Sequence, residues 1–252
     1  MNAAQLSAHL DALPGHIGLY YEDLTTGETF AYHADEAFSA ASIIKLPMMA
    51  AIARKTALGE AQWEERILAT KADRVPPCGA LCFFREDIAV RIDTLCELMI
   101  TLSDNMATNL LMRRFTIDGL NADFRAMGLV KTHLERLLFD SAAAKLGKTN
   151  VFTPAEMGTL LKDLWLRAQK HDPDAVFCME TLMQQQINHK IPGYLPDVSI
   201  AHKTGEDDGI THDVAIVLGD RPFLLCFASN DTDVPAAERL LRQIALELYE
   251  NR

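Results

Sequence analysis

The chain has 252 residues, of which 49% are hydrophobic and 23% are charged. This length and composition fit one soluble globular domain, or two interleaved lobes, with enough apolar surface for a packed core. The formal net charge is −11 and the basic residues do not cluster, which argues against nucleic acid or an anionic membrane surface as a partner.

The five cysteines form neither a C-x-x-C pair nor a Cys/His metal-binding pattern. An odd number leaves at least one thiol free, which fits a reducing compartment. The first residues lack the basic and apolar regions of a signal peptide, and no stretch is long and apolar enough for a membrane span. The chain as given is therefore expected to be cytoplasmic; it would be periplasmic or secreted if a signal peptide had been removed.

The first part of the chain predicts a helix, a hairpin and a buried helix. These elements are expected over residues 3–12, over 17–21 with 29–32, and over 43–52. The turn Thr25-Thr26-Gly27-Glu28 separates the two hairpin strands. The third segment is apolar on every side apart from Lys45, as in a helix at the centre of a lobe. Pro47 within it would remove one backbone hydrogen bond.

The middle of the chain predicts helices, and the C-terminal third predicts strands and a last helix. Helices are expected over 93–102, 104–115, from Thr153 onward and over about 174–186; antiparallel strands over 198–204, 210–218 and 222–228; and a helix over about 235–249. Because strands lie at both ends, the predicted fold is α+β, with one sheet built from both termini. The α/β lobe would comprise about 1–40 and 190–252, and an inserted all-helical lobe 41–189.

Three short motifs occur once each: Ser42-Ile43-Ile44-Lys45, Ser103-Asp104-Asn105 and Lys203-Thr204-Gly205. An S-x-x-K alone is expected about once by chance in a chain of this length, so each motif is weak by itself. As an ordered set they match the S-x-x-K, S-D-N and K-T-G motifs of serine β-lactamases and penicillin-binding proteins.

On these residues the sequence resembles a class A β-lactamase-related serine hydrolase almost from end to end. The likeness extends to three flanking segments, Phe38 to Ser42, Leu98 to Leu111 and His212 to Val217. The resemblance implies an α/β/α fold in which helices flank an antiparallel sheet. It also implies an active-site cleft between this sheet and the helical lobe.

The first motif has a physical basis for nucleophilic chemistry. A spacing of three places Lys45 on the same helix face as Ser42, one turn further along. An ordinary lysine has a pKa of about 10.4, too high for a general base at neutral pH. Burial, the helix N-terminus and the second cation, Lys203, are expected to lower it. A neutral Lys45 could then take the Ser42 proton as the hydroxyl attacks a carbonyl.

The other two motifs have expected roles in proton transfer and substrate binding. Ser103 would relay a proton to the leaving group, and Asn105 would bind a substrate amide. Asp104 is expected to cap a helix rather than to act in catalysis. Lys203 and Thr204 would supply a charge and a hydroxyl to a substrate carboxylate.

The end of the third motif is expected to lie along the substrate. Gly205 would leave room for a substrate to lie along the strand as an added β-partner. By resemblance, the oxyanion hole would be formed by the backbone N–H groups of Ser42 and Glu206.

One group of the family pattern is missing. In class A β-lactamases a glutamate on a loop after the S-D-N lobe activates the water that releases the acyl-enzyme. Alignment of 132–136 with the start of that loop places Leu138 at the glutamate and Ala142 at its asparagine partner. Asp140 is the nearest carboxylate and a candidate deacylation base.

An ordinary structural role is preferred for Asp140, namely an ion pair with Arg136 or Lys145.

Several residues near the motifs are likewise assigned ordinary packing roles. Cys78 and Cys82 are expected to pack rather than to react. Phe83 and Phe84 are expected to fill core.

His202 and His212 could contact a substrate. An equally good explanation is that both are polar groups whose hydrogen bonds are satisfied within the protein. The eight histidines contain no H-E-x-x-H pattern, so no catalytic metal and no cofactor are expected. A G-x-S-x-G elbow is also absent, which argues against an α/β-hydrolase.

The expected function is hydrolysis of a β-lactam, or a related amide or ester, through an acyl-enzyme on Ser42 with weak deacylation. D-alanyl peptidase and esterase activities share this chemistry and stay open. So does a penicillin-recognising acyl trap or sensor without turnover. The intact motifs disfavour a non-catalytic scaffold, and glutaminases fit the second and third motifs less well. The expected partner is a small-molecule substrate. The protein itself is expected to be a monomer.

Overall fold

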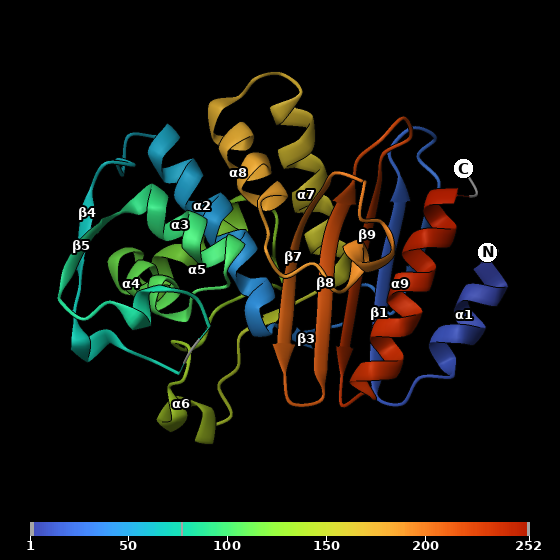
Figure 1. Cartoon of the computed structure of the whole chain (residues 1–252), viewed down its shortest axis with the longest axis horizontal. Helices are drawn as coiled ribbons and strands as arrows, with labels where there is room; N and C mark the ends of the chain where they lie inside the picture. The colour runs from blue at the N-terminus through green and yellow to red at the C-terminus, as the bar shows by residue number, and fades with distance from the viewer. Residues whose placement is uncertain (1–2, 77, 251–252) are drawn as a thin grey trace.

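The computed structural model describes residues 3–76 and 78–250. A five-stranded antiparallel sheet stands beside a helical lobe (Figure 1). In sheet order its strands are β2 (Thr29–Tyr32), β1 (His16–Asp23), β9 (Phe223–Asn230), β8 (Ile210–Val217) and β7 (Ile200–Asp207). β1 pairs with β9 along its whole length, from His16 opposite Asn230 to Asp23 opposite Phe223. The predicted sheet from both termini is therefore confirmed.

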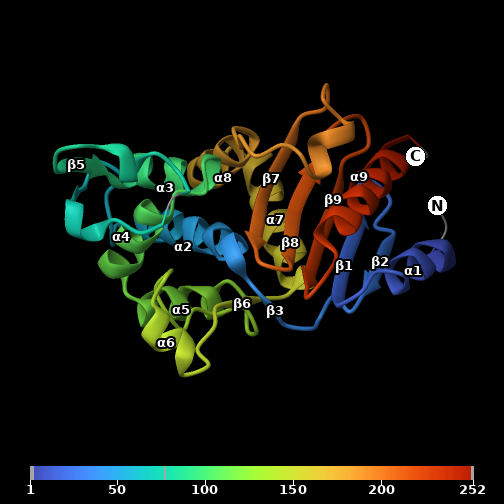
Figure 2. The ribbon, with the colours of Figure 1, turned by 60° about the horizontal axis from the view of Figure 1, so that its bottom comes forward.

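Both faces of the sheet are buried. Along β9, Leu224 and Cys226 face one core, whereas Leu225 and Phe227 face the other. Helices α1 (Ala3–Asp11) and α9 (Val234–Glu250) cover the second face, and α7 (Pro154–Ala168) covers the first (Figure 2). Two buried faces explain why β9 and the second half of β8 are apolar almost without interruption instead of alternating with polar residues.

The helical lobe is built around one buried helix. Its elements are the 3₁₀ segment η1 (Ala41–Ile44) and helices α2 (Lys45–Ala57), α3 (Ile92–Thr101), α4 (Asn105–Phe115), α5 (Ile117–Ala126) and α8 (Pro173–Met183). Every residue of α2 from Lys45 to Ala53 is buried, as predicted. Pro47 is the third residue of α2. First-turn N–H groups lack regular α-helical partners, so a proline there costs less than in mid-helix.

Helix α7 falls within the range that the sequence assigns to the helical lobe, yet it packs on β1, β8 and β9. Gly158 allows this close approach, since a Cβ at that position would lie 2.4 Å from Tyr20 Cδ1. A two-residue pairing of β3 (Phe38–Ser39) with β6 (Val151–Phe152) joins the chain before the first motif to the segment that leads into α7.

Other short elements were not predicted: the β4 (Arg66–Ala69) and β5 (Ile88–Arg91) pair, the 3₁₀ segments η2 (Lys71–Asp73), η3 (Leu81–Phe83) and η4 (Ile191–Tyr194), and helix α6 (Ser141–Lys145). The expectation that Phe83 and Phe84 fill core is wrong, because their side chains are 74% and 46% exposed. Leu81 is buried instead, since the tight 3₁₀ turn directs only one of the three apolar residues inward.

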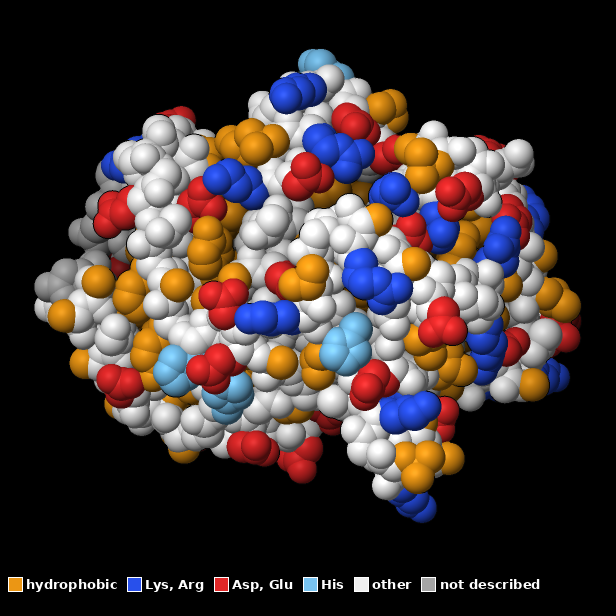
Figure 3. Space-filling view, turned by 180° about the vertical axis from the view of Figure 1, so that it is seen from behind, with side chains coloured by type: hydrophobic (Ala, Val, Ile, Leu, Met, Phe, Trp, Pro, Cys, Tyr) orange, Lys and Arg blue, Asp and Glu red, His pale blue; other side chains and the backbone are white. Residues whose placement is uncertain are grey.

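The surface carries charges of both signs. On the face shown in Figure 3, acidic and basic side chains are interspersed and no large basic area forms. Within residues 3–76 and 78–250, no helix combines the length and apolar character needed to cross a bilayer.

Candidate active site

A cavity of about 550 Å³ lies where the three motifs meet. Ser42, Ser103, Asn105 and Thr204 line it, and so do Glu206 and Asp140. The rest of its wall is formed by Ser39, Ala41, Cys78, Arg136, Leu138, Phe139, Ser141, Ala144, Thr149, Asn150, Ile187 and Asp207. The structure thus brings together residues that are up to 168 positions apart, from Ser39 to Asp207. They lie on β3, η1, the α3–α4 junction, the loop around α6, and β7.

Ser42 lies at the start of the buried helix, in the 3₁₀ segment η1. The backbone N–H of Lys45 donates to the Ser42 carbonyl, and side chains three residues apart on a 3₁₀ turn stand above one another. Ala41, directly before Ser42, has a φ of 41°. This left-handed conformation costs roughly 1–2 kcal/mol for an alanine. The hydrogen bond from Ala40 N to Asn150 O, at 2.8 Å, helps to hold the turn.

Lys45 is fully buried, and its amine contacts residues of the S-D-N motif. Its Nζ donates to Ser103 O at 2.8 Å, to Ser103 Oγ at 3.0 Å and to Asn105 Oδ1 at 2.8 Å. Burial lowers the pKa of Lys45 to about 7, although the charge of nearby Asp104 opposes the shift. Within the described part of the chain, no hydrogen bond joins this amine to Ser42. The two side chains share a helix turn, and Ser103 lies between the amine and the cavity.

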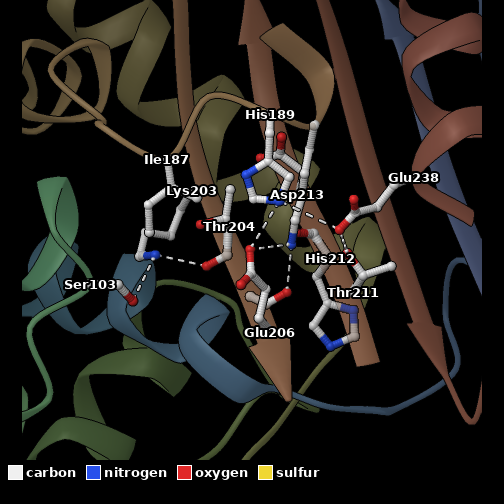
Figure 4. A network of polar contacts seen from close by, with 12 residues as sticks. Ser103, Ile187, His189, Lys203, Thr204, Glu206, Thr211, His212, Asp213 and Glu238 are labelled. Carbon is white, nitrogen blue, oxygen red and sulfur yellow. Dashed lines mark hydrogen bonds and ion pairs between the residues drawn. The ribbon is translucent and has the colours of Figure 1, made fainter. Parts of the chain in front are cut away.

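The Ser103 hydroxyl also accepts a hydrogen bond from a second lysine. Lys203 Nζ donates to Ser103 Oγ at 3.2 Å and to Thr204 O at 2.7 Å (Figure 4). Burial, followed by repulsion from Lys45, holds the pKa of Lys203 well below its usual range. A hydroxyl has two acceptor positions and one hydrogen. Because both lysines occupy the acceptor side of Ser103, its hydrogen is free to be donated into the cavity.

Asp104 is structural, as predicted. It is the N-cap of α4, where Oδ1 accepts from Ala107 N at 2.9 Å. Its Oδ2 accepts from Ala80 N at 2.7 Å and from Leu81 N at 2.8 Å. A Cβ at Gly79 would lie 2.3 Å from this same oxygen. The carboxylate therefore fixes the loop that carries Cys78 to the start of the S-D-N helix.

Gly205 brings the K-T-G strand against the nucleophile segment. A Cβ at this position would lie 3.0 Å from Ile43 Cγ1 and 2.9 Å from His212 Cδ2. The space that the missing side chain leaves is thus occupied by η1 and β8. Glu206, the next residue, points its half-exposed carboxylate toward Lys190 Nζ at 3.1 Å and His189 Nε2 at 3.4 Å (Figure 4).

Two asparagines that the sequence reasoning missed hold the loop next to the cavity. Asn109 Oδ1 accepts from Leu138 N at 2.9 Å, and Asn109 Nδ2 donates to Leu138 O at 3.0 Å. Asn150 Oδ1 accepts from the backbone N–H groups of residues 135 and 136, and Asn150 Nδ2 donates to Arg136 O. The signal for Asn109 was its position four residues after Asn105, on the same helix face.

Asp140 lines the cavity, but its carboxylate is engaged elsewhere. It is the N-cap of α6, and Oδ1 accepts from Ala143 N at 2.9 Å. The preferred role, an ion pair with Arg136 or Lys145, is wrong: among the described residues, no ion pair includes Asp140. The guanidinium of Arg136 donates instead to the carbonyl of Lys148 at 3.1 Å. The cap uses a main-chain N–H that the helix already positions, whereas an ion pair would have to order a long and flexible side chain.

The two histidines beside the third motif are satisfied polar groups outside the cavity wall. His212 Nδ1 accepts from Ser229 N at 3.1 Å, so its Nε2 carries the proton and donates to Ser39 O at 2.8 Å. Burial lowers the pKa of His212 to about 3, which keeps the ring neutral. The ring nitrogens of His202 contact Asp213 and Asn188.

Cys78 lines the cavity, and its thiol donates to a backbone carbonyl at 3.4 Å. The potential metal ligands His16, His33 and Glu36 lie within 4.8 Å of one another, at the surface. None of the three lines the cavity, and His16 Nε2 already bonds Glu36 Oε2 at 2.6 Å.

Replacement of Asp104 by Ala should destabilise the protein by about 2–4 kcal/mol. The substitution removes a helix cap, worth about 1 kcal/mol, and leaves two loop N–H groups without an acceptor. Urea denaturation followed by circular dichroism measures the loss. Asp73→Ala, which removes a more exposed cap, serves as the comparison. An equal or smaller loss for Asp104→Ala would contradict this account of the loop.

The family and the solved structures agree with this geometry. The model of the β-lactamase enzyme family matches residues 2–251. A β-lactamase from Sphaerobacter thermophilus is similar over 100% of this chain and 98% of its own, with 26% identity and a TM-score of 0.87. PBP-A is similar over 99% of this chain and 94% of its own, with 25% identity and a TM-score of 0.88.

A mutant of PBP-A in an acyl-enzyme complex with penicillin G shares the fold, with 24% identity, a TM-score of 0.88, and coverage of 99% of this chain and 95% of its own. An ancestral class A β-lactamase, also 24% identical, covers 99% of both chains with a TM-score of 0.87. The family match spans nearly the whole sequence, and all three motifs meet at one cavity. The chain belongs to the β-lactamase enzyme family.

Proposed function

We propose that this protein is a serine hydrolase that forms an acyl-enzyme on Ser42 with a β-lactam, or a related amide or ester, and releases the acyl group slowly. The observation that carries the proposal is the buried amine of Lys45, bound to Ser103 and Asn105 one helix turn from Ser42. A pKa of about 7 leaves much of this amine neutral at physiological pH. A base in that state can accept a proton from a serine hydroxyl.

In the proposed acylation, Ser42 Oγ attacks the substrate carbonyl and gives its proton to Lys45 Nζ. The negative charge on the carbonyl oxygen is stabilised by the backbone N–H groups of Ser42 and Glu206. Ser103 then donates its hydrogen to the leaving nitrogen or oxygen, and takes a proton from Lys45 in return. The carbon–nitrogen or carbon–oxygen bond breaks, and Lys45 is neutral again. Thr204, which lines the cavity, binds a carboxylate of the substrate.

Slow deacylation follows from what surrounds the cavity near α6. Leu138 contributes an apolar side chain where the family pattern has a glutamate, and the Asp140 carboxylate is used as a helix cap. In this proposal Leu138 cannot activate water, and Asp140, whose Oδ1 caps α6, is a poor base. This observation also favours a second candidate function, a penicillin-recognising acyl trap in which the adduct on Ser42 is the end state.

Intact-mass spectrometry with benzylpenicillin, a cephalosporin and a small ester tests the proposal. The wild type should gain the mass of the acyl group and keep it for minutes, whereas Ser42→Ala should gain none. Ser39→Ala is the matched control, because Ser39 lines the same cavity and should leave the adduct unchanged. Absence of any adduct on the wild type contradicts acylation. Fast, complete hydrolysis without a trapped adduct contradicts slow release.

The acylation rate should rise with pH through about 7. Below that value Lys45 is protonated and cannot accept the Ser42 proton, so the rate should fall by about tenfold per pH unit. Above it the rate should level off. Stopped-flow measurement of acylation with a chromogenic cephalosporin between pH 5 and 9 gives the profile. A profile that is flat across pH 7 would exclude Lys45 as the base.

Replacement of Leu138 by Glu should shorten the life of the acyl-enzyme. The main chain of Leu138 is held by Asn109, so a carboxylate introduced there would enter the cavity from a fixed position. A placed general base contributes about 10²–10⁴-fold in rate. The decay of the adduct mass after removal of free penicillin measures the effect. Leu138→Gln is the control of equal size, and equal lifetimes for both variants would contradict the assignment.

A further inference from the structure

Lys190 is a fully buried lysine that belongs to none of the three motifs. It directly precedes η4, on the segment that leads into β7. Its Nζ donates to Gly205 O at 3.0 Å and to His212 O at 3.1 Å, and lies 3.1 Å from Glu206 Oε1. An ammonium has three donors, so these three oxygens satisfy it completely. The cation is therefore fixed against the K-T-G strand, and Lys190 itself is not a lining residue of the cavity.

The carbonyl that Lys190 holds belongs to the same peptide group as the Glu206 N–H. Gly205 is the register partner of His212, and Lys190 Nζ reaches the carbonyl oxygens of both residues, so the Gly205 carbonyl is directed toward β8. In a trans peptide the C=O and the N–H point in opposite directions. Because β7 is the edge strand of the sheet, the Glu206 N–H is directed outward, and Glu206 lines the cavity.

We propose that Lys190 is a positioning residue for acylation: its ammonium polarises and fixes the Gly205–Glu206 peptide, which makes the Glu206 N–H a stronger donor to the oxyanion. The inference rests on the proposed function, in which this N–H is one of the two oxyanion donors. A hydrogen bond to a carbonyl strengthens the N–H of the same amide, and a charged donor does so more than a neutral one.

The expected decrease in the acylation rate is smaller than the decrease that removal of the whole Glu206 N–H donor would cause. Complete removal of one oxyanion donor lowers the rate by about 10²–10³-fold. Lys190 acts on the donor through the peptide and leaves it in place. Loss of its charge should therefore lower the acylation rate constant by about tenfold, with little change in the dissociation constant of the noncovalent complex.

Lys190 also neutralises the Glu206 carboxylate at the cavity, so the two roles must be separated. Substitution of Glu206 removes the carboxylate and keeps the backbone N–H. The experiment compares Lys190→Met with the parent chain in two backgrounds, wild type and Glu206→Gln. Stopped-flow kinetics gives the acylation rate constant and the noncovalent dissociation constant separately. Infrared spectroscopy of the trapped acyl-enzyme gives the stretching frequency of the ester carbonyl.

The Met substitution should slow acylation by about tenfold in both backgrounds and shift the carbonyl stretch to higher frequency, as a weaker oxyanion hole requires. Lys190→Gln keeps a neutral donor, so its acylation rate and carbonyl frequency should lie between those of the parent chain and of Lys190→Met. Lys162→Met is the matched control, since it removes another lysine–glutamate pair, with Glu22, that does not line the cavity. It should leave the rate and the frequency unchanged.

A rate loss that disappears in the Glu206→Gln background, or an unchanged carbonyl frequency, overturns the inference and leaves acylation of Ser42 standing. Absence of acylation in the wild type overturns both. If circular dichroism shows that Lys190→Met is unfolded, the same two comparisons with Lys190→Gln decide the matter.

Discussion

The structure depends on the burial of one amine, that of Lys45. To take an ammonium group out of water costs several kcal/mol unless an opposite charge accompanies it. Here the three oxygens that contact the amine belong to a backbone carbonyl, a hydroxyl and an amide, none of which carries a charge. The amine therefore lowers its cost by losing its proton near neutral pH. Burial of α2 thus forms the core of a lobe and, in the proposed mechanism, also makes Lys45 a base.

Two unfavourable backbone conformations lie at residues that line the cavity, and the neighbouring structure stabilises them. Ala41 and Ser103 both have left-handed φ values, of 41° and 52°. Each lies at the start of a helix that presents a motif, so the strain directs the chain into the cavity. The close contact of Gly205 with Ile43 holds the strand edge against the nucleophile segment. Side chains on three separate elements are fixed by packing rather than by flexible loops.

In the proposed mechanism, acylation and deacylation depend on different parts of the molecule. The acylating groups lie on η1, α2, the α3–α4 junction and β7, which belong to the packed cores of the two lobes. The loop that would activate water is held instead by the amides of Asn109 and Asn150 through backbone contacts. Those contacts involve only the main chain, so the side chains of this loop can change without loss of its position. A chain can thereby keep the acylating centre and lack the hydrolytic one.

The sequence by itself determined the motifs, the order of the main helices and strands, and a sheet from both termini, because periodicity and caps are local properties of the chain. Tertiary structure decided which groups meet. Lys45 contacts Ser103 and Asn105, 58 and 60 positions away, rather than the Ser42 hydroxyl one turn back. Lys190, buried before η4 and bonded to the K-T-G strand, belongs to no pattern. Such contacts depend on how the two lobes pack, and that packing cannot be predicted from the pattern of an isolated segment.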